Sequence, residues 1–231
     1  VDPDRVETMP IGSRAVEVAD EHEELIFSPP PATKDGQRTR PLRLIFLGYD
    51  HPYKGLHTLA DALELIVPEL LSQVDLAVFA QNGVRSEWRF RRLAPRPARL
   101  TYHHGYAPPD VPWMLGGRDL GVVPSIWWDN GPQTVHELLA CGVPVLGARA
   151  GGIPDMVSHD VNGLLFAGND RYDFARQIVR AIRAPELLDR LRSRVNRPRS
   201  MAEHGREMEV LYQRVACEPS RSDTVETGGV A

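Results

Sequence analysis

Residues 42–67 read LRLIFLGYDHPYKGLHTLADALELIV, and this stretch contains the pattern on which the fold depends. Residues 42–47 form an apolar run that ends at Gly48, which is typical of a strand buried on both faces of a sheet. After a polar loop, apolar residues recur from Leu56 to Val67 at the spacing of an amphipathic helix. A buried strand followed by a helix is the repeating unit of a parallel sheet.

The same alternation continues toward the C-terminus. Further strands are expected at residues 74–79, 100–103, 120–123, 143–146 and 164–166. Further helices are expected at residues 133–140, near residues 154–157, and starting at Asp170, Pro185 and Ala202. The sequence therefore predicts an α/β fold, a doubly wound, Rossmann-like parallel sheet with helices on both faces, over residues 42–216.

The two ends of the chain differ from this pattern. Residues 1–41 are predicted to be an interdomain strand and linker region, with a short strand at residues 6–9. Residues 15–41 contain acids, arginines and three consecutive prolines, which favour an irregular crossing of the surface. Residues 217–231 are polar and rich in small side chains, which predicts a flexible tail.

Composition excludes several functional classes. With 231 residues, 42% hydrophobic and 25% charged, the chain has the make-up of a globular protein. No apolar run approaches the ~20 residues of a membrane span, and no secretory leader is recognisable. Two cysteines cannot form a disulfide framework, so a cytoplasmic location is expected. The net charge of −4 argues against nucleic-acid binding, and the arginines at 89, 91 and 92 are expected to form a solvated helix face.

The loop from Gly48 to Gly55 is the first candidate for binding chemistry. It does not follow the G-x-G-x-x-G pattern, so a nicotinamide-dependent enzyme loses its main support. It does contain Lys54, one of only two lysines among 27 basic residues; the other is Lys34. A cation at a helix start is favourable where it shares an anion with the helix amides. On this loop alone, a simply solvated lysine is an equally good interpretation.

Residues 124–137, PSIWWDNGPQTVHE, form a second candidate loop that leads into a helix. Pro132 suits the first helical position, and the free amides that follow, with Gly131 permitting close approach, form a site for a phosphate. Gln133 and Glu137 are four residues apart and so lie on one helical face. A carboxylate at Glu137 is suited to accept two hydrogen bonds from a diol such as ribose.

Structural interpretations of the same residues stay open. Asp129 is also suited to cap a helix, and Glu137 to form a salt bridge. Trp127 and Trp128 suit core or interface packing, and His136 is more typical of a packed histidine than of a catalyst. A third loop contains Gly151-Gly152, which permits close approach of the backbone to a ligand or simply a tight turn.

Taken together, these motifs resemble the C-terminal half of the retaining GT-B glycosyltransferases of family 4. The family's E-x7-E pattern is matched by Asp129-x7-Glu137, and its first loop by Phe46-Leu47-Gly48 and Lys54-Gly55. Further matches follow in order at Val122-Val123-Pro124-Ser125, Ala140-x-Gly142-x-Pro144-Val145, Gly151-Gly152-Ile153-Pro154-Asp155 and Asn162-Gly163-Leu164.

The resemblance implies two Rossmann-like domains with a nucleotide sugar, a UDP- or GDP-sugar, between them as substrate. It implies that Lys54 contacts the donor diphosphate, that Glu137 holds the ribose, and that Asp129 contacts the transferred sugar; these are the expected catalytic residues. It implies no cofactor and no metal ion. The other donor-binding residues implied by the resemblance are Gly48, Tyr49, Gly105, Tyr106, Asn130, Gly131, Gln133 and Thr134.

Departures from the family pattern leave alternatives open. Asp129 is one methylene shorter than the family's glutamate, and no arginine follows Gly48. The acceptor-binding N-terminal domain has no room before residue 42, so the chain is expected to need that domain, or a partner chain that supplies it, for transfer. A non-catalytic nucleotide- or protein-binding module derived from such an enzyme is the main alternative. A sugar-nucleotide epimerase or a phosphorylase agrees less well with the motifs.

Overall fold

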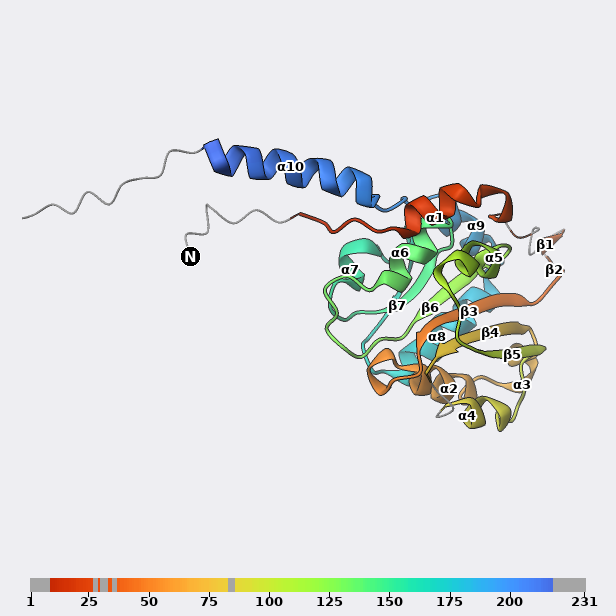
Figure 1. Cartoon of the computed structure of the whole chain (residues 1–231). Coiled ribbons are helices and arrows are strands. Elements are labelled where there is room, and N and C mark those ends of the chain that lie inside the picture. The colour runs from red at the N-terminus through yellow and green to blue at the C-terminus, as the bar shows by residue number, and fades with distance from the viewer. Residues whose placement is uncertain (1–8, 27–28, 30–32, 35–36, 83–85, 218–231) are drawn as a thin grey trace, which may run out of the picture.

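A six-stranded parallel sheet forms the centre of the molecule, as the computed structural model of the chain shows (Figure 1). The structure describes residues 9–26, 29, 33–34, 37–82 and 86–217. The order of the strands is β5-β4-β3-β6-β7-β8, so β3, the first strand of this sheet in sequence, lies in the middle and the order reverses beside it. This arrangement confirms the predicted doubly wound, Rossmann-like fold. The strands are β3 (Leu42–Tyr49), β4 (Val74–Gln81), β5 (Arg99–His104), β6 (Leu120–Val123), β7 (Val145–Ala148) and β8 (Gly163–Phe166).

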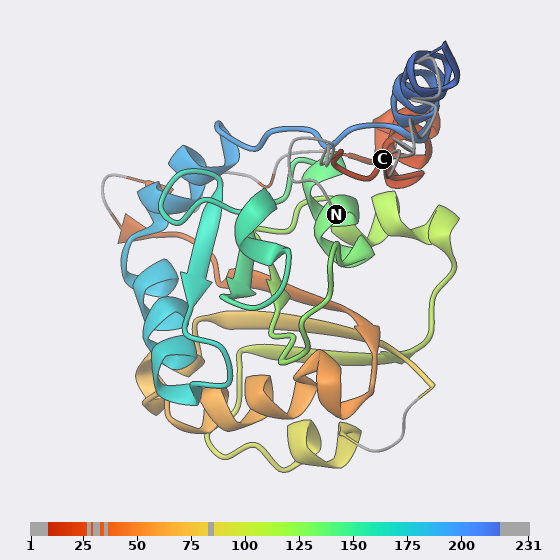
Figure 2. The same cartoon turned by 90° about the vertical axis from the view of Figure 1, so that its left-hand side faces the viewer.

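Helices cover both faces of the sheet (Figures 1 and 2). The α-helices of the described residues are α1 (Ala15–Glu21), α2 (Leu56–Glu64), α3 (Pro68–Leu71), α4 (Glu87–Arg91), α5 (Val111–Leu115), α6 (Gln133–Ala140), α7 (Ile153–Met156), α8 (Arg171–Arg183), α9 (Pro185–Arg192) and α10 (Met201–Cys217), the last of which does not cover the sheet. Alternate strand residues supply two cores: Phe46 faces the side of α2, α4, α8 and α9, and Ile45 faces the side of α1, α5, α6 and α7. Both side chains are almost fully buried, as parallel strands require.

Two predicted elements differ in detail from the structure. The expected helix through Val67 ends at Glu64, and a separate short helix begins at Pro68. Val67 has a ψ of 149°, because the proline ring that follows excludes the helical conformation at this position. The strand expected at residues 143–146 instead spans Val145–Ala148, after Pro144, which has no N–H to donate to the ladder.

The segment 15–41, expected to be an irregular crossing, contains more regular structure than predicted, because residues 15–25 are mostly helical. This segment contains α1, the 3-10 turn η2 (Glu23–Leu25) and a short antiparallel pair, β1 (Thr33–Lys34) with β2 (Gln37–Arg38). Val16 and Ala19, three residues apart, are buried, and α1 packs on α6. Acidic neighbours obscured this apolar face in the sequence. Residues 6–8 of the strand expected at 6–9 lie outside the described residues.

The final helix, α10, extends away from the sheet beside the N-terminal segment (Figures 1 and 2). None of its residues is buried. Its start packs tightly on Gly12, where an added Cβ would lie 2.6 Å from the His204 Cβ. A further link joins the Ser13 N–H to the Arg199 carbonyl at 3.0 Å. The tail predicted at residues 217–231 begins at the last residue of this helix, and residues 218–231 lie outside the described part of the chain.

A close backbone contact joins two loops at the point where the strand order reverses. The loop after β3 contains the 3-10 turn η3 (Pro52–Lys54), and the Tyr53 carbonyl accepts hydrogen bonds from the Ile126 N–H (2.9 Å) and the Ser125 hydroxyl (3.1 Å). Gly55 follows with φ of 69°, and an added Cβ there would lie 1.8 Å from the Pro124 carbonyl oxygen. Only glycine permits this approach. The contact therefore fixes the loop of Lys54 against the loop that follows β6.

Replacing Gly55 tests this contact, and Gly142→Ala provides a matched control. Gly142 has almost the same φ, 68°, but no atom lies within 4 Å of its added Cβ. We expect Gly142→Ala to lower the free energy of unfolding by about 1–2 kcal/mol, the cost of the left-handed conformation. Gly55→Ala adds a backbone collision, so we expect a loss of more than about 3 kcal/mol in urea unfolding. Equal losses in the two variants would contradict the close contact.

Candidate functional site

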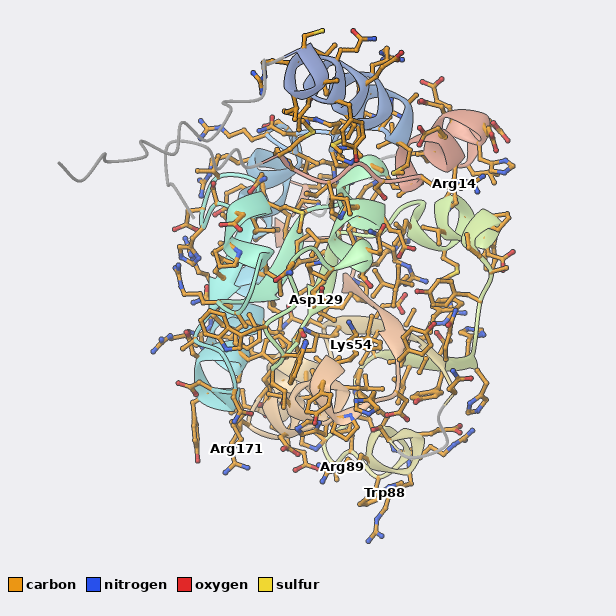
Figure 3. All side chains as sticks on the ribbon, turned by 60° about the vertical axis from the view of Figure 1, so that its left-hand side comes forward. Arg14, Lys54, Trp88, Arg89, Asp129 and Arg171 are labelled. Atoms are coloured by element: carbon orange, nitrogen blue, oxygen red, sulfur yellow. The ribbon has the colours of Figure 1, made fainter. Side chains whose placement is uncertain are left out.

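The candidate residues lie on loops at the carboxyl ends of the strands. In an open parallel sheet this edge holds the crevice where ligands bind, at the point where the strand order reverses. Here that point lies between β3 and β6. The loop after β3 supplies Lys54 from η3, and the loop after β6 supplies Asp129 and leads into α6. Figure 3 shows Lys54 and Asp129 in the middle of this edge.

Lys54 and Asp129 form an ion pair between the two loops. The Lys54 Nζ lies 3.1 Å from the Asp129 Oδ2, and the side chains are 35% and 31% exposed. The second carboxylate oxygen, Oδ1, accepts a hydrogen bond from the Gly131 N–H at 3.3 Å. Asp129 thus contacts both the cation and an amide of the loop predicted to bind a phosphate. The sequence alone did not predict this pair.

Beside Lys54 is a pocket of about 460 Å³ with an aromatic rim. Its lining residues are Tyr49, Asp50, His51, Tyr53, Lys54, Gln81, Asn82 and Trp127. The rings of Tyr53 and Trp127 lie 4.9 Å apart, and about half of each side chain is exposed. Trp128 is 77% exposed, so the core-packing interpretation of the two tryptophans is wrong in this chain. Of the predicted donor-binding residues, Tyr49 and Lys54 line this pocket.

Asp50 anchors the floor of the pocket, and the sequence analysis missed it. Its carboxylate accepts hydrogen bonds from the Ser86 N–H (2.8 Å), the Ser86 hydroxyl (2.6 Å) and the Tyr102 hydroxyl (3.2 Å). Burial and the nearby Asp50 charge raise the pKa of Tyr102, which keeps its hydroxyl as a donor. No local signal identifies Asp50, because its partners are 36 and 52 residues further along the chain.

Glu137 lies one turn into α6 and is half-buried. Burial raises the pKa of its carboxyl group to about 7. Its Oε2 atom is buried and has no hydrogen-bond partner among the described residues. Glu137 forms no ion pair with any described residue, so the interpretation of Glu137 as a salt-bridge partner is not supported. Burial and then the Glu137 charge raise the pKa of Tyr106, with a smaller effect from Tyr49. Glu137 therefore lies near Tyr106, another predicted donor-binding residue.

The start of α6 agrees only in part with the predicted phosphate site. Pro132 precedes Gln133, the first residue of the helix, and leaves the next amides without helical partners. The Gln133 side chain accepts a hydrogen bond from the Ser13 hydroxyl at 3.0 Å, so it faces the N-terminal segment. Thr134 is half-buried. His136 is buried and its ring lies 3.4 Å from the Pro132 carbonyl, which supports the interpretation of a packed histidine.

Gly151 and Gly152 bring the loop after β7 onto the backbone of the Asp129 loop. An added Cβ on Gly151 would lie 2.3 Å from the Asp129 carbonyl oxygen, and one on Gly152 would lie 2.2 Å from that of Asn130. The Gly152 N–H donates to the Asp129 carbonyl at 2.7 Å. The close approach that the paired glycines predicted is therefore to another loop of the protein itself.

The loop after β5 holds the expected base-binding segment. Gly105 has φ of 84° and its N–H donates to the Ala80 carbonyl at 2.8 Å. The Gln81 amide donates to the Tyr106 carbonyl at 2.9 Å, which ties this loop to the pocket. Gly48, the second-last residue of β3, has φ of 145° and leads the chain into the Lys54 loop.

The described residues contain neither a candidate metal site nor a candidate membrane-spanning helix. None of the histidine, cysteine, aspartate and glutamate side chains there form a group of three or more that is suited to hold a metal ion. No helix formed by the described residues is both long enough and apolar enough to cross a bilayer.

The amino-acid sequence has recognisable relatives. D-inositol 3-phosphate glycosyltransferase 2 of Catenulispora acidiphila is 32% identical over 155 residues, which are 63% of this chain and 36% of that protein. The putative colanic acid biosynthesis glycosyltransferase WcaL of Escherichia coli is 26% identical over 210 residues, 82% of this chain and 47% of WcaL. The chain therefore spans less than half the length of either curated relative.

Solved structures share the fold. HepE of Anabaena, crystallised in complex with UDP-glucose, superposes with a TM-score of 0.63 at 20% identity, over 89% of this chain and 54% of HepE. A glycosyltransferase from Rickettsia africae superposes with a TM-score of 0.69 at 15% identity, over 94% of this chain and 59% of that protein. The family model for glycosyl transferases group 1 matches residues 32–197. Because that match spans well over half of the chain, this protein belongs to the group 1 glycosyltransferases.

Proposed function

We propose that this chain is the donor-binding half of a retaining GT-B glycosyltransferase of family 4, which transfers a hexose from a UDP- or GDP-sugar. The observation that carries the proposal is the Glu137 carboxylate, whose Oε2 is buried with no partner in the described part of the chain. A buried acceptor without a partner is costly. The two hydroxyls of a ribose would supply the missing donors, at the edge of the sheet where nucleotides bind.

The remaining donor contacts follow from the ion pair and the helix start. Lys54 and the amide N–H groups of Gly131, Gln133 and Thr134 would hold the diphosphate and stabilise its charge as the glycosidic bond breaks. Asp129 would exchange Lys54 for a hydroxyl group of the transferred sugar. The backbone of Gly105 and Tyr106 would bind the base. HepE was crystallised with UDP-glucose, so UDP-glucose is the first donor to test.

Transfer itself would need an acceptor-binding N-terminal domain, in a longer chain or in a partner chain. Two features support this part of the proposal. The relatives are at least twice as long as the matched region. In addition, α10 extends away from the sheet, and its residues Val210, Tyr212 and Val215 are each more than half exposed. Residues 1–41 would then act as the interdomain region, and we expect the enzyme to work in the cytoplasm.

A non-catalytic nucleotide- or protein-binding module is the second candidate. The ion pair favours it, because Asp129 already neutralises Lys54 and the chain lacks an arginine after Gly48. Transfer of glucose from UDP-glucose by a longer chain or a reconstituted complex would select the enzyme. Nucleotide binding without any transfer in the same assay would select the module.

Calorimetry with UDP and GDP tests the donor site, and the second lysine provides the control. We expect the chain to bind one of them, and Lys54→Met to weaken binding by about 10- to 100-fold, since hydrogen bonds to charged groups contribute roughly 1.5–3 kcal/mol. Lys34→Met, in β1 and distant in sequence from the site, should leave the affinity unchanged. No heat with UDP, GDP or their sugars would exclude the proposed site, as would an equal loss in both variants.

The raised pKa of Glu137 gives a pH-dependent test. Its carboxyl group titrates at about 7 in the folded chain against an ordinary 4.5, so between these values the folded state holds a proton that the unfolded state has released. The stability that the raised pKa of Glu137 contributes is therefore fully present below pH 4.5 and is lost as the pH rises through about 7. We expect the Tm of Glu137→Gln to gain a few degrees on wild type between about pH 5 and about pH 8.

Nucleotide affinity should change in the opposite direction. The ionised carboxylate accepts two ribose hydroxyls better than the acid does, so the affinity of wild type for UDP relative to that of Glu137→Gln should rise over the same pH interval. Glu186→Gln, at an exposed position in α9, controls for the loss of one carboxylate. A constant affinity ratio at all pH values would show that Glu137 does not contact the ligand.

A further inference from the structure

A second surface of unusual chemistry lies on α4 and the connection to β5. Residues 87–99 read EWRFRRLAPRPAR and contain five arginines and a tryptophan. The arginine patch is defined as Trp88, Arg89, Arg91, Arg92, Arg96 and Arg99. It lies at the end of the molecule farthest from α10, and Figure 3 shows Trp88 and Arg89 at that end. None of its members lines the pocket beside Lys54.

The tryptophan in this patch points outward between two guanidinium groups. Trp88 is 52% exposed, and the guanidinium carbons of Arg89 and Arg92 lie 5.4 and 5.9 Å from its ring centroid. A guanidinium group stacked on an indole keeps its N–H edge available to an anionic oxygen. A third such pair, Arg171 at 5.1 Å from the Tyr172 ring, lies toward the same end in Figure 3.

The patch has an excess of positive charge in a chain of net charge −4. The Arg89 guanidinium is 2.6 Å from the Asp61 carboxylate, and the Arg91 Nε donates to Glu87 at 2.7 Å. The other three arginines have no ion-pair partner among the described residues: Arg92, Arg96 and Arg99. Charge complementarity therefore points to an anionic partner.

A pocket of about 540 Å³ opens within the patch. Its apolar lining includes Phe90 and Pro97, both buried, and Leu100. Its charged lining consists of Arg91, Arg96 and Arg99. A guanidinium group can donate two parallel hydrogen bonds to the oxygens of a phosphate, and apolar lining residues can contact the hydrocarbon part of a ligand. A ligand that carries both a phosphate and an aliphatic part fits this lining better than a free phosphate or a nucleic-acid backbone.

We propose that the arginine patch binds the surface of an anionic phospholipid bilayer, with a lipid phosphate in this pocket and the Trp88 indole among the headgroups. Indole rings prefer the interface between water and lipid. Basic side chains add an electrostatic attraction to anionic lipids, and this attraction is weakened by salt. Binding of this kind is reversible, because it relies on surface charge and one interfacial side chain.

The bilayer would then hold the donor site in a defined orientation. Ser86, the residue before α4, is fixed to Asp50 through both its N–H and its hydroxyl group. Asp50 lines the pocket beside Lys54. The helix on the lipid surface and the floor of the donor site therefore belong to one rigid unit, and an acceptor embedded in the same membrane would meet the site from a constant direction.

Vesicle co-sedimentation tests the proposal with the whole chain. We expect binding to vesicles in which about a third of the phosphatidylcholine is replaced by phosphatidylglycerol, weaker binding at high salt, and little binding to phosphatidylcholine alone. The triple variant Arg92→Gln, Arg96→Gln, Arg99→Gln should bind about a hundredfold more weakly, roughly fivefold for each arginine removed. Trp88→Ala should also weaken binding, and this loss should persist at high salt.

The control removes the same charge elsewhere. Arg183→Gln, Arg190→Gln, Arg194→Gln changes three exposed arginines, at the end of α8, in α9 and just after α9, and should retain wild-type vesicle binding. Both triple variants should keep the wild-type Tm and response to UDP, which separates this proposal from that for the donor site. Equal binding to neutral and anionic vesicles, equal loss in the two triple variants, or binding to nucleic acid but not to vesicles would overturn it.

Discussion

The candidate site depends on one backbone contact, that of Gly55 with the Pro124 carbonyl at the point where the strand order reverses. No residue with a Cβ fits there, since the added atom would lie 1.8 Å from the carbonyl oxygen. Because the Tyr53 carbonyl is bonded to Ser125 and Ile126 in the same place, Lys54 is held opposite Asp129. The paired glycines of the loop after β7 then support the Asp129 backbone from the other side. Three loops thereby form a single rigid edge.

At this edge of the sheet, one charged side chain has a partner of opposite charge and another does not. Lys54 already has a carboxylate partner, whereas the carboxylate of Glu137 is buried with one oxygen unpartnered in the described part of the chain. A nucleoside diphosphate would reverse both conditions, because its phosphates compete with Asp129 for the lysine and its ribose hydroxyls supply donors to Glu137. To bind Lys54, the phosphates of such a ligand must therefore displace the Asp129 carboxylate. The affinity for the ligand then depends on Asp129 as much as on Lys54.

The sheet was readable from the sequence because parallel strands buried on both faces are mostly apolar runs, as residues 44–47 illustrate. The helix starts at Gln133 and after Asp170 were equally clear, since proline and aspartate mark them locally. Long-range contacts were not readable. The partners of Asp50 lie 36 and 52 residues away, and Gly151-Gly152 meets a loop more than 20 residues earlier in the chain. The buried face of α1 was missed because Val16 and Ala19 are surrounded by acidic residues.

A crystal structure of the chain with UDP is the decisive test of the donor site, because it locates the diphosphate and the ribose independently. The account requires the phosphates to contact the Lys54 Nζ and the start of α6, the Asp129–Lys54 bond to be broken, and the ribose hydroxyls to bind Glu137. UDP bound elsewhere, or bound at this edge with Asp129 still on Lys54 and the Glu137 carboxylate still unpartnered, would contradict it.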